Sequence, residues 1–139
     1  MAIATATDVR TMANWPTGVS DPMLAPHIDG ASRDLRAAIT PDKYAEITDG
    51  ADADLKAMCA EIEACFAIAY AIPALHMLQL EGAPGLPKAV SELEFTFLDQ
   101  DEAAALADTW RERGERRLAQ LDVTDDGEAV NPAPRMYAI

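Results

Sequence analysis

The stretch DADLKAMCAEIEACFAIAYAIPALHMLQL, residues 52–80, decides the fold. Its apolar side chains recur at spacings of three and four residues, which predicts a helix with a buried face. Beyond Glu63 the segment is apolar nearly all round, which indicates burial on several sides, by its own domain or by other subunits. Glu61, Glu63 and Lys56 lie off the centre of the stripe, and Pro73 is expected to kink or end the helix. The stripe consists of Leu55, Met58, Cys59, Ile62, Phe66, Ala69 and Tyr70.

A second long helix is predicted over residues 21–38. Ser20 or Asp21 can cap it, and Pro22 falls in its first turn. Pro26 removes a backbone hydrogen bond beyond that turn, so the regular helix is expected to begin only there. The apolar stripe of this helix consists of Leu24, Ile28, Ala31, Leu35 and Ala38.

Two short segments carry helix-start signals. A short helix is predicted over residues 8–13, with Thr7 as its cap. One or two helical turns are predicted over residues 40–48, with Tyr44 and Ile47 turned inward.

The last helix is predicted from Asp99 or Asp101 to Leu121. Gly114 lies on its apolar face and costs about 1 kcal/mol against alanine. A glycine at such a position indicates close packing against another helix.

Residues 91–99, SELEFTFLD, alternate apolar and polar side chains. This period of two predicts one short strand or hairpin with Leu93, Phe95 and Phe97 on its buried face. A lone strand leaves its backbone groups unpaired, so its partner is either a weak strand of the same chain or a strand of a neighbouring subunit.

The predicted fold is therefore mainly α. It is a small bundle of three to four helices around one long central helix, with a single short strand or hairpin and an extended C-terminal tail. A length of 139 residues fits one domain. We assign residues 1–121 to the helical domain and residues 122–139 to the tail, which is acidic in its first half and proline-stiffened and apolar at its end.

The chain carries 24 acidic and 11 basic residues, which gives a net charge of -13. Binding nucleic acid through phosphate neutralisation requires a basic surface, so this composition disfavours it. No apolar run is expected to span a bilayer, and the N-terminus lacks the pattern of a secretory signal. We therefore expect a cytoplasmic protein without a membrane partner.

The cysteines and histidines form no recognisable site. Cys59 and Cys65 are six residues apart on a helix, about 9 Å, which is too far for a disulfide, so both are expected in the core. His27 and His76 have no partner at a metal-ligand spacing and are expected at the surface or at helix ends. The sequence has no phosphate loop, nucleophile elbow or zinc pattern, so we expect no catalytic residue, no cofactor, no metal and no enzyme.

Residues 110–117, WRERGERR, gather four arginines near the end of the last helix. At about 100° per residue, Arg117 falls close to Trp110, and Arg113 lies at the edge of the apolar stripe. One interpretation is a helix C-terminus stabilised by its cations, with Arg117 packed on Trp110. The other is that Arg113 and Arg117 enter a subunit interface and meet carboxylates there.

The helical segments follow one another as TDVR (7–10), VSDPMLAPHIDGASRDLRAAI (19–39), AEIEACFAIAYAIPALHML (60–78) and EAAALADTWRERGERRLAQL (102–121). Over roughly residues 7–121, this layout resembles the head–tail connector (adaptor) proteins of tailed bacteriophages and gene transfer particles. The most telling part is the capped second segment, with Ser20, Asp21, Leu24, Ile28, Ala31, Ser32 and Leu35.

The resemblance implies a structural virion protein, assembled in the host cytoplasm and placed at the neck of the particle. It implies an oligomeric ring, commonly of twelve copies, between the portal protein and the tail or neck proteins. Packaged double-stranded DNA would pass through its channel without sequence-specific binding. A neighbouring copy could complete the strand, and the tail would be a docking arm. The expected interface residues are Trp110, Arg113, Arg116, Arg117, Phe95, Phe97, Met136, Tyr137 and Ile139.

Three other hypotheses stay open. The first is a small acidic helical binding protein that mimics DNA and inhibits a nucleic-acid-binding partner. The second is a helical enzyme or ligand-binding domain with a pocket near Cys65, Tyr70 and His76. The third is a helical dimer without a viral role.

Overall fold

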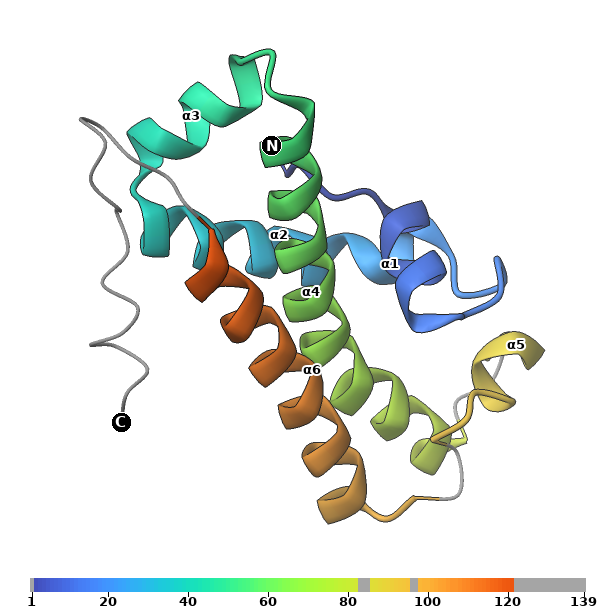
Figure 1. Ribbon diagram of the computed structural model, residues 1–139. Coiled ribbons are helices and arrows are strands. Elements are labelled where there is room, and N and C mark those ends of the chain that lie inside the picture. Colours follow the sequence, from blue (N-terminus) through green and yellow to red (C-terminus); the bar gives the residue numbers. More distant parts are fainter. Residues whose placement is uncertain (1, 83–85, 96–97, 122–139) are drawn as a thin grey trace.

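The computed structural model describes residues 2–82, 86–95 and 98–121, and these residues form six α-helices (Figure 1). The prediction of a mainly helical fold is confirmed. The predicted count of three to four helices is too low, because three of the six are short. The helices are α1 (Ala6–Ala13), α2 (Asp21–Ile39), α3 (Pro41–Asp49), α4 (Ala53–Glu81), α5 (Lys88–Ser91) and α6 (Gln100–Gln120).

The long helix α4 lies at the centre and packs against each of the other five helices, with α6 running alongside it (Figure 1). The side chains of residues 62–69 are all buried, although successive positions point in all directions around a helix. The domain itself therefore surrounds this part of α4, and no second subunit is needed to bury it.

By length and composition alone, α4 could cross a membrane, which the sequence reasoning did not anticipate. Of its most apolar 18-residue window, 67% is buried inside the fold. The core helix of a folded domain passes the same test of length and composition, so this property is weak evidence for a membrane span.

Both internal prolines lie inside continuous helices. α4 runs past Pro73 and ends at Gly82, whose φ of 59° is a left-handed conformation that commonly ends helices. α2 begins at Asp21 and not at Pro26, because the N–H groups of Met23 and Leu24 already donate to the carbonyl of Ser20. The prediction that α2 begins only at Pro26 was wrong. At Pro73 the predicted end of the helix is excluded, because α4 continues to Glu81. Both proline rings lie on exposed sides of their helices.

The two short N-terminal helices are both present. α1 is capped by Thr5 and not by Thr7: the Thr5 hydroxyl accepts the N–H of Asp8, and the Asp8 carboxylate accepts the N–H of Thr5. In α3 the side chains of Tyr44 and Ile47 are buried, as predicted.

The predicted strand over residues 91–99 is wrong in its described part. Residues 88–91 form α5, and residues 92–95 form turns and a bend. Leu93 donates its N–H to the carbonyl of Val90, and Leu98 donates to the carbonyl of Phe95, as in successive turns. The alternation arises because these turns bury Leu93 and Phe95. Phe97 lies outside the described residues.

α6 begins after Asp99, which forms a capping box with Glu102. The predicted close approach at Gly114 is confirmed. A Cβ atom on Gly114 would lie 2.7 Å from Cε1 of Phe66 and 3.0 Å from Cβ of Cys65, closer than a methyl group can pack. The absence of a side chain at Gly114 therefore sets the distance between α6 and α4.

Candidate interaction surface

The arginines of α6 lie on both flanks of the helix, and two of them form ion pairs with described residues of the chain. Nε of Arg117 lies 3.2 Å from Oε1 of Glu61 on α4, an ion pair without the geometry of a hydrogen bond. Arg117 also donates to the side chain of Gln120. Trp110, which one interpretation placed against Arg117, packs against Arg113 instead. The guanidinium carbon of Arg113 lies 4.9 Å from the centre of the Trp110 ring.

On the opposite flank, Arg111 joins α6 to α4 and α2. Its guanidinium carbon lies 4.8 Å from the centre of the Tyr70 ring, and its Nη1 lies 3.9 Å from Oδ2 of Asp34. The Tyr70 hydroxyl donates to the same carboxylate. This hydrogen bond, assisted by burial, raises the pKa of Tyr70. Sequence reasoning missed this contact, because no local pattern brings residues 34, 70 and 111 together.

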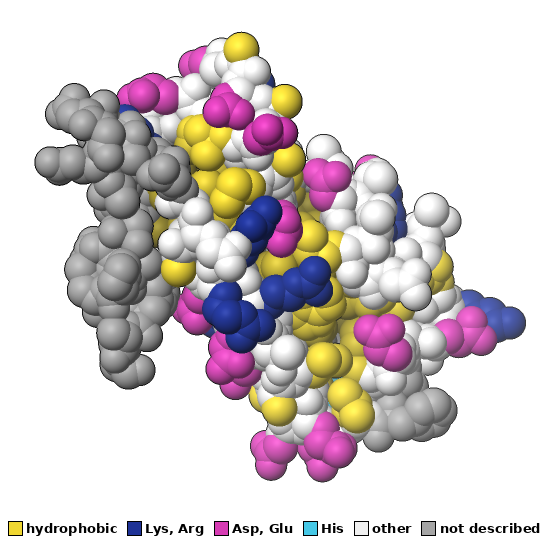
Figure 2. All heavy atoms as spheres, in the orientation of Figure 1, with side chains coloured by type: hydrophobic (Ala, Val, Ile, Leu, Met, Phe, Trp, Pro, Cys, Tyr) yellow, Lys and Arg dark blue, Asp and Glu magenta, His cyan; other side chains and the backbone are white. Residues whose placement is uncertain are grey.

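Arg113 and Arg116 remain the most available cations of the cluster. Both side chains are exposed, and within the part of the chain that the structure describes no carboxylate forms an ion pair with either. Figure 2 shows Lys and Arg side chains gathered where α6 lies against α4, bordered by hydrophobic side chains. We call Trp110, Arg113, Arg116 and Arg117 the arginine flank.

Of the other expected interface residues, the structure describes Phe95 alone. Phe95 is 0% exposed, and its ring centre lies 6.1 Å from that of Trp15 and 6.3 Å from that of His76. The expectation that it enters an interface is therefore wrong, since the single chain already encloses it. Met136, Tyr137 and Ile139 lie, like Phe97, outside the described residues.

A groove between α1 and α4 adjoins the arginine flank. It has a volume of about 370 Å³ and an apolar floor that includes Met12, Ala60 and Ala64. Asp8 and Glu61 also line it. Because Glu61 is the carboxylate that pairs with Arg117, the groove and the arginine flank meet at this residue.

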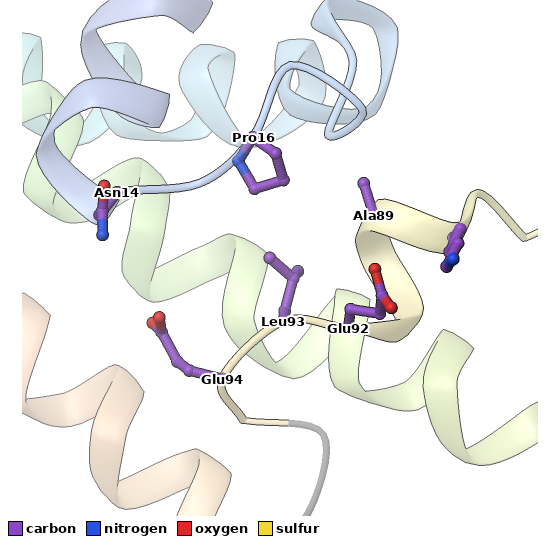
Figure 3. A pocket seen from close by; sticks show the side chains of 7 residues that line it. Asn14, Pro16, Ala89, Glu92, Leu93 and Glu94 are labelled. Atoms are coloured by element: carbon purple, nitrogen blue, oxygen red, sulfur yellow. The ribbon is translucent and has the colours of Figure 1, made fainter.

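A second hollow, of about 470 Å³, lies between the loop after α1 and the segment around α5 (Figure 3). Asn14 and Pro16 line it on one side, and Ala89 and Leu93 on the other, together with exposed charged residues. Neither hollow is lined by Cys65, Tyr70 or His76, around which the ligand-binding hypothesis expected a pocket.

The most unusual buried group is Glu63, which is 0% exposed although sequence reasoning placed it off the buried stripe. Its Oε1 accepts the N–H groups of Ile3 and Ala4, at 2.9 Å and 2.8 Å, and its Oε2 accepts the hydroxyl of Tyr44. The Tyr44 oxygen also lies 3.0 Å from Oγ of Ser32. This network ties the N-terminal segment to α2, α3 and α4.

Burial sets the protonation chemistry of this network. It raises the pKa of Glu63, although the two backbone N–H groups and the Tyr44 hydroxyl oppose the shift. Burial and the hydrogen bond to Glu63 raise the pKa of Tyr44 to about 12. Each acceptor and donor has a partner, so the cluster has the properties of a structural tie and not of an open catalytic site.

Both cysteines and His76 are also enclosed in the core. Cys59 and Cys65 are buried and free, as expected, and burial raises their pKa values to about 12 and about 11. His76 is only 2% exposed, and its Nε2 donates to the carbonyl of Leu98, so its expected place at the surface was wrong. His27 is half-buried, which lowers its pKa.

Among the described residues, no three His, Cys, Asp or Glu side chains lie close enough together to hold a metal ion. No protein-family model, curated protein or solved structure matches the chain.

Proposed function

We propose that this protein is a head–tail connector (adaptor) of a tailed bacteriophage or gene transfer particle, a structural protein whose working unit is a ring of identical copies. The observation that carries the proposal is the arginine flank. Arg113 and Arg116 extend from the surface of a chain whose net charge is -13. Each copy thus presents a local positive surface and a large excess of carboxylates, so copies complement one another.

The arginine flank is suited to contact between proteins. Arg113 rests on the face of Trp110, which holds the guanidinium in place. Among the described residues no carboxylate pairs with this guanidinium, so its N–H groups can bind a carboxylate of another copy. Aromatic and arginine side chains dominate the binding energy of many interfaces. A ring contact centred here would bury Trp110 and pair Arg113 and Arg116 with acidic side chains of the next copy.

Exposed apolar side chains on α4 also support an oligomer. Tyr70, Met77 and Leu80 are 36%, 43% and 52% exposed. They lie on the C-terminal half of the helix, together with exposed Pro73 and Ala74. A neighbouring copy or the portal protein would cover this surface. An acidic channel wall would let double-stranded DNA pass without binding it.

Charge reversal tests the proposal. We expect the purified wild-type chain to form discrete assemblies at 10 to 500 µM, and Arg113→Glu/Arg116→Glu to remain a monomer with unchanged helical circular dichroism. Arg33→Glu, at an exposed position of α2, is the matched control and should assemble normally. Intact rings formed by the double variant, seen by mass photometry and electron microscopy, would refute the role of the arginine flank.

The alternative, a DNA-mimicking inhibitor, is supported by the net charge alone. It predicts a monomer or dimer that blocks a nuclease or repressor at micromolar concentration. The exposed arginines favour the connector, because cations on the surface of a DNA mimic would repel its basic partner.

A further inference from the structure

Two surfaces of opposite character lie side by side on one face of the molecule. The arginine flank of α6 is positive, and the groove between α1 and α4 is apolar and lined by the carboxylates of Asp8 and Glu61. The two surfaces meet at the pair formed by Arg117 and Glu61. A ligand that fits this face must therefore carry negative charge at one end, and positive charge with apolar side chains at the other.

The C-terminal segment of the chain has this composition and this order. Residues 122–128, DVTDDGE, carry four carboxylates. The last residues, PRMYAI, carry Arg135, the sole basic residue after Arg117, next to Met136 and Tyr137. The 18 residues beyond Leu121 can reach roughly 60 Å when extended, enough to cross a neighbouring molecule of this size.

We propose that residues 122–139 of one copy dock across the α6–α4–α1 face of the adjacent copy. Asp122, Asp125, Asp126 and Glu128 bind the arginine flank, and Arg135 with the apolar residues that follow it binds the acidic-rimmed groove. This inference rests on the proposed function, because it requires a multi-chain assembly. Beyond the proposed function, it identifies residues 122–139 as the ligand of the groove. It also implies that each copy is linked to the next through this segment.

An adjacent copy is a better source of the segment than the same chain. Arg113 lies eight residues, or about 12 Å, back along α6 from Leu121. The chain's own segment would have to reverse direction directly after the helix to reach it. The segment of a neighbour approaches the face from outside and needs no such reversal.

Photo-crosslinking in the full-length protein tests the docking. A benzoylphenylalanine residue replaces Tyr137 in equal amounts of unlabelled and ¹⁵N-labelled chain, which are mixed, assembled and irradiated. We expect crosslinks to the groove, around Met12 and Ala60, in peptide pairs of mixed isotope composition. Random assembly of the two chains also crosslinks copies of the same isotope, so only a result with no mixed pairs would place the segment on its own chain, and crosslinks to another surface would place it elsewhere. Either result overturns the proposal.

Variants sharpen this experiment. Ala60→Trp fills the groove and should reduce the crosslink yield at least tenfold, whereas Ala45→Trp, at an exposed position of α3, should leave it unchanged. Arg135→Glu should reduce it about threefold, the effect of one partly exposed ion pair. An equal yield from Ala60→Trp and the wild type contradicts the docking.

The mass of the uncrosslinked protein distinguishes a failure of this inference from a failure of the proposed function. An oligomer without crosslinks to the groove leaves the connector proposal standing and refutes the docking. A chain that stays monomeric at every concentration refutes both.

Discussion

Replacing Glu63 tests how the core accommodates a buried carboxyl group. Glu63→Leu would leave the N–H group of Ala4 without its acceptor, and the N–H group of Ile3 with the Tyr44 oxygen as its remaining acceptor. A buried donor without a partner costs about 1–3 kcal/mol. Detachment of the N-terminal segment would limit the loss, so we expect the free energy of unfolding to fall by about 1–3 kcal/mol.

Glu63→Gln should be far milder. The amide oxygen can accept both backbone N–H groups, while the amide N–H donates to the Tyr44 oxygen and the Tyr44 hydroxyl turns to Ser32. Every hydrogen bond is kept, so the free energy of unfolding should change by no more than about 1 kcal/mol at pH 5.

Comparing the pH dependence of stability of the wild type and Glu63→Gln tests whether burial raises the pKa of Glu63. Because burial raises the pKa of Glu63, the contribution of this group to stability is fully present below the carboxyl's ordinary pKa and is lost as pH rises through the folded value. The slope is about 1.4 kcal/mol per pH unit between the two values. Glutamine does not titrate, so the free energy of unfolding of the variant should rise relative to that of the wild type from pH 4 to pH 8.

Urea unfolding at pH 4, 5, 6, 7 and 8 measures both effects. Glu61→Gln is the control: it removes a carboxylate two residues away that is about one-third exposed and paired with Arg117, and it should cost at most about 1 kcal/mol. The reasoning fails if Glu63→Leu lowers the free energy of unfolding by less than about 1 kcal/mol. It also fails if the wild type becomes more stable relative to Glu63→Gln as pH rises.

Three further predictions concern packing, thiol chemistry and a helical proline. Gly114→Ala should lower the free energy of unfolding by about 1–3 kcal/mol in urea titrations, because its methyl group has no room against α4; if it stabilises the protein, the packing described here is wrong. Cys59 and Cys65 should not react with an aromatic disulfide reagent at pH 8 in the native state, and both should react in 6 M guanidinium, because burial raises their pKa values to about 12 and about 11; rapid labelling of the folded chain would contradict this. Pro26→Ala should raise the melting temperature, because it restores a hydrogen bond on an exposed side of α2; a lower melting temperature would mean that the proline ring has a packing role.

The helices α2, α4 and α6 could be predicted because their apolar side chains repeat with the helical period over many turns. The predicted stripe of α2 is buried at Leu24, Ile28, Ala31 and Leu35, and Gly114 marks the closest contact of α6. These features depend on positions within one segment, which sequence periodicity reports directly.

Contacts between segments could not be predicted in the same way. Residues 91–99 are too short for a period of two to distinguish a strand from turns that bury Leu93 and Phe95. Glu63 lies off the predicted stripe, and its burial depends on backbone N–H groups some 60 positions earlier in the sequence. The in-chain partner of Arg117 is likewise fixed by how α6 lies on α4.

The central claim is that the working unit contains several copies, and the mass of the assembly tests it most directly. Native mass spectrometry of the full-length protein at increasing concentration should give a discrete species at a whole multiple of 14.9 kDa. Electron microscopy of the same sample should show closed rings. A single species at 14.9 kDa at every concentration up to 500 µM would contradict the account.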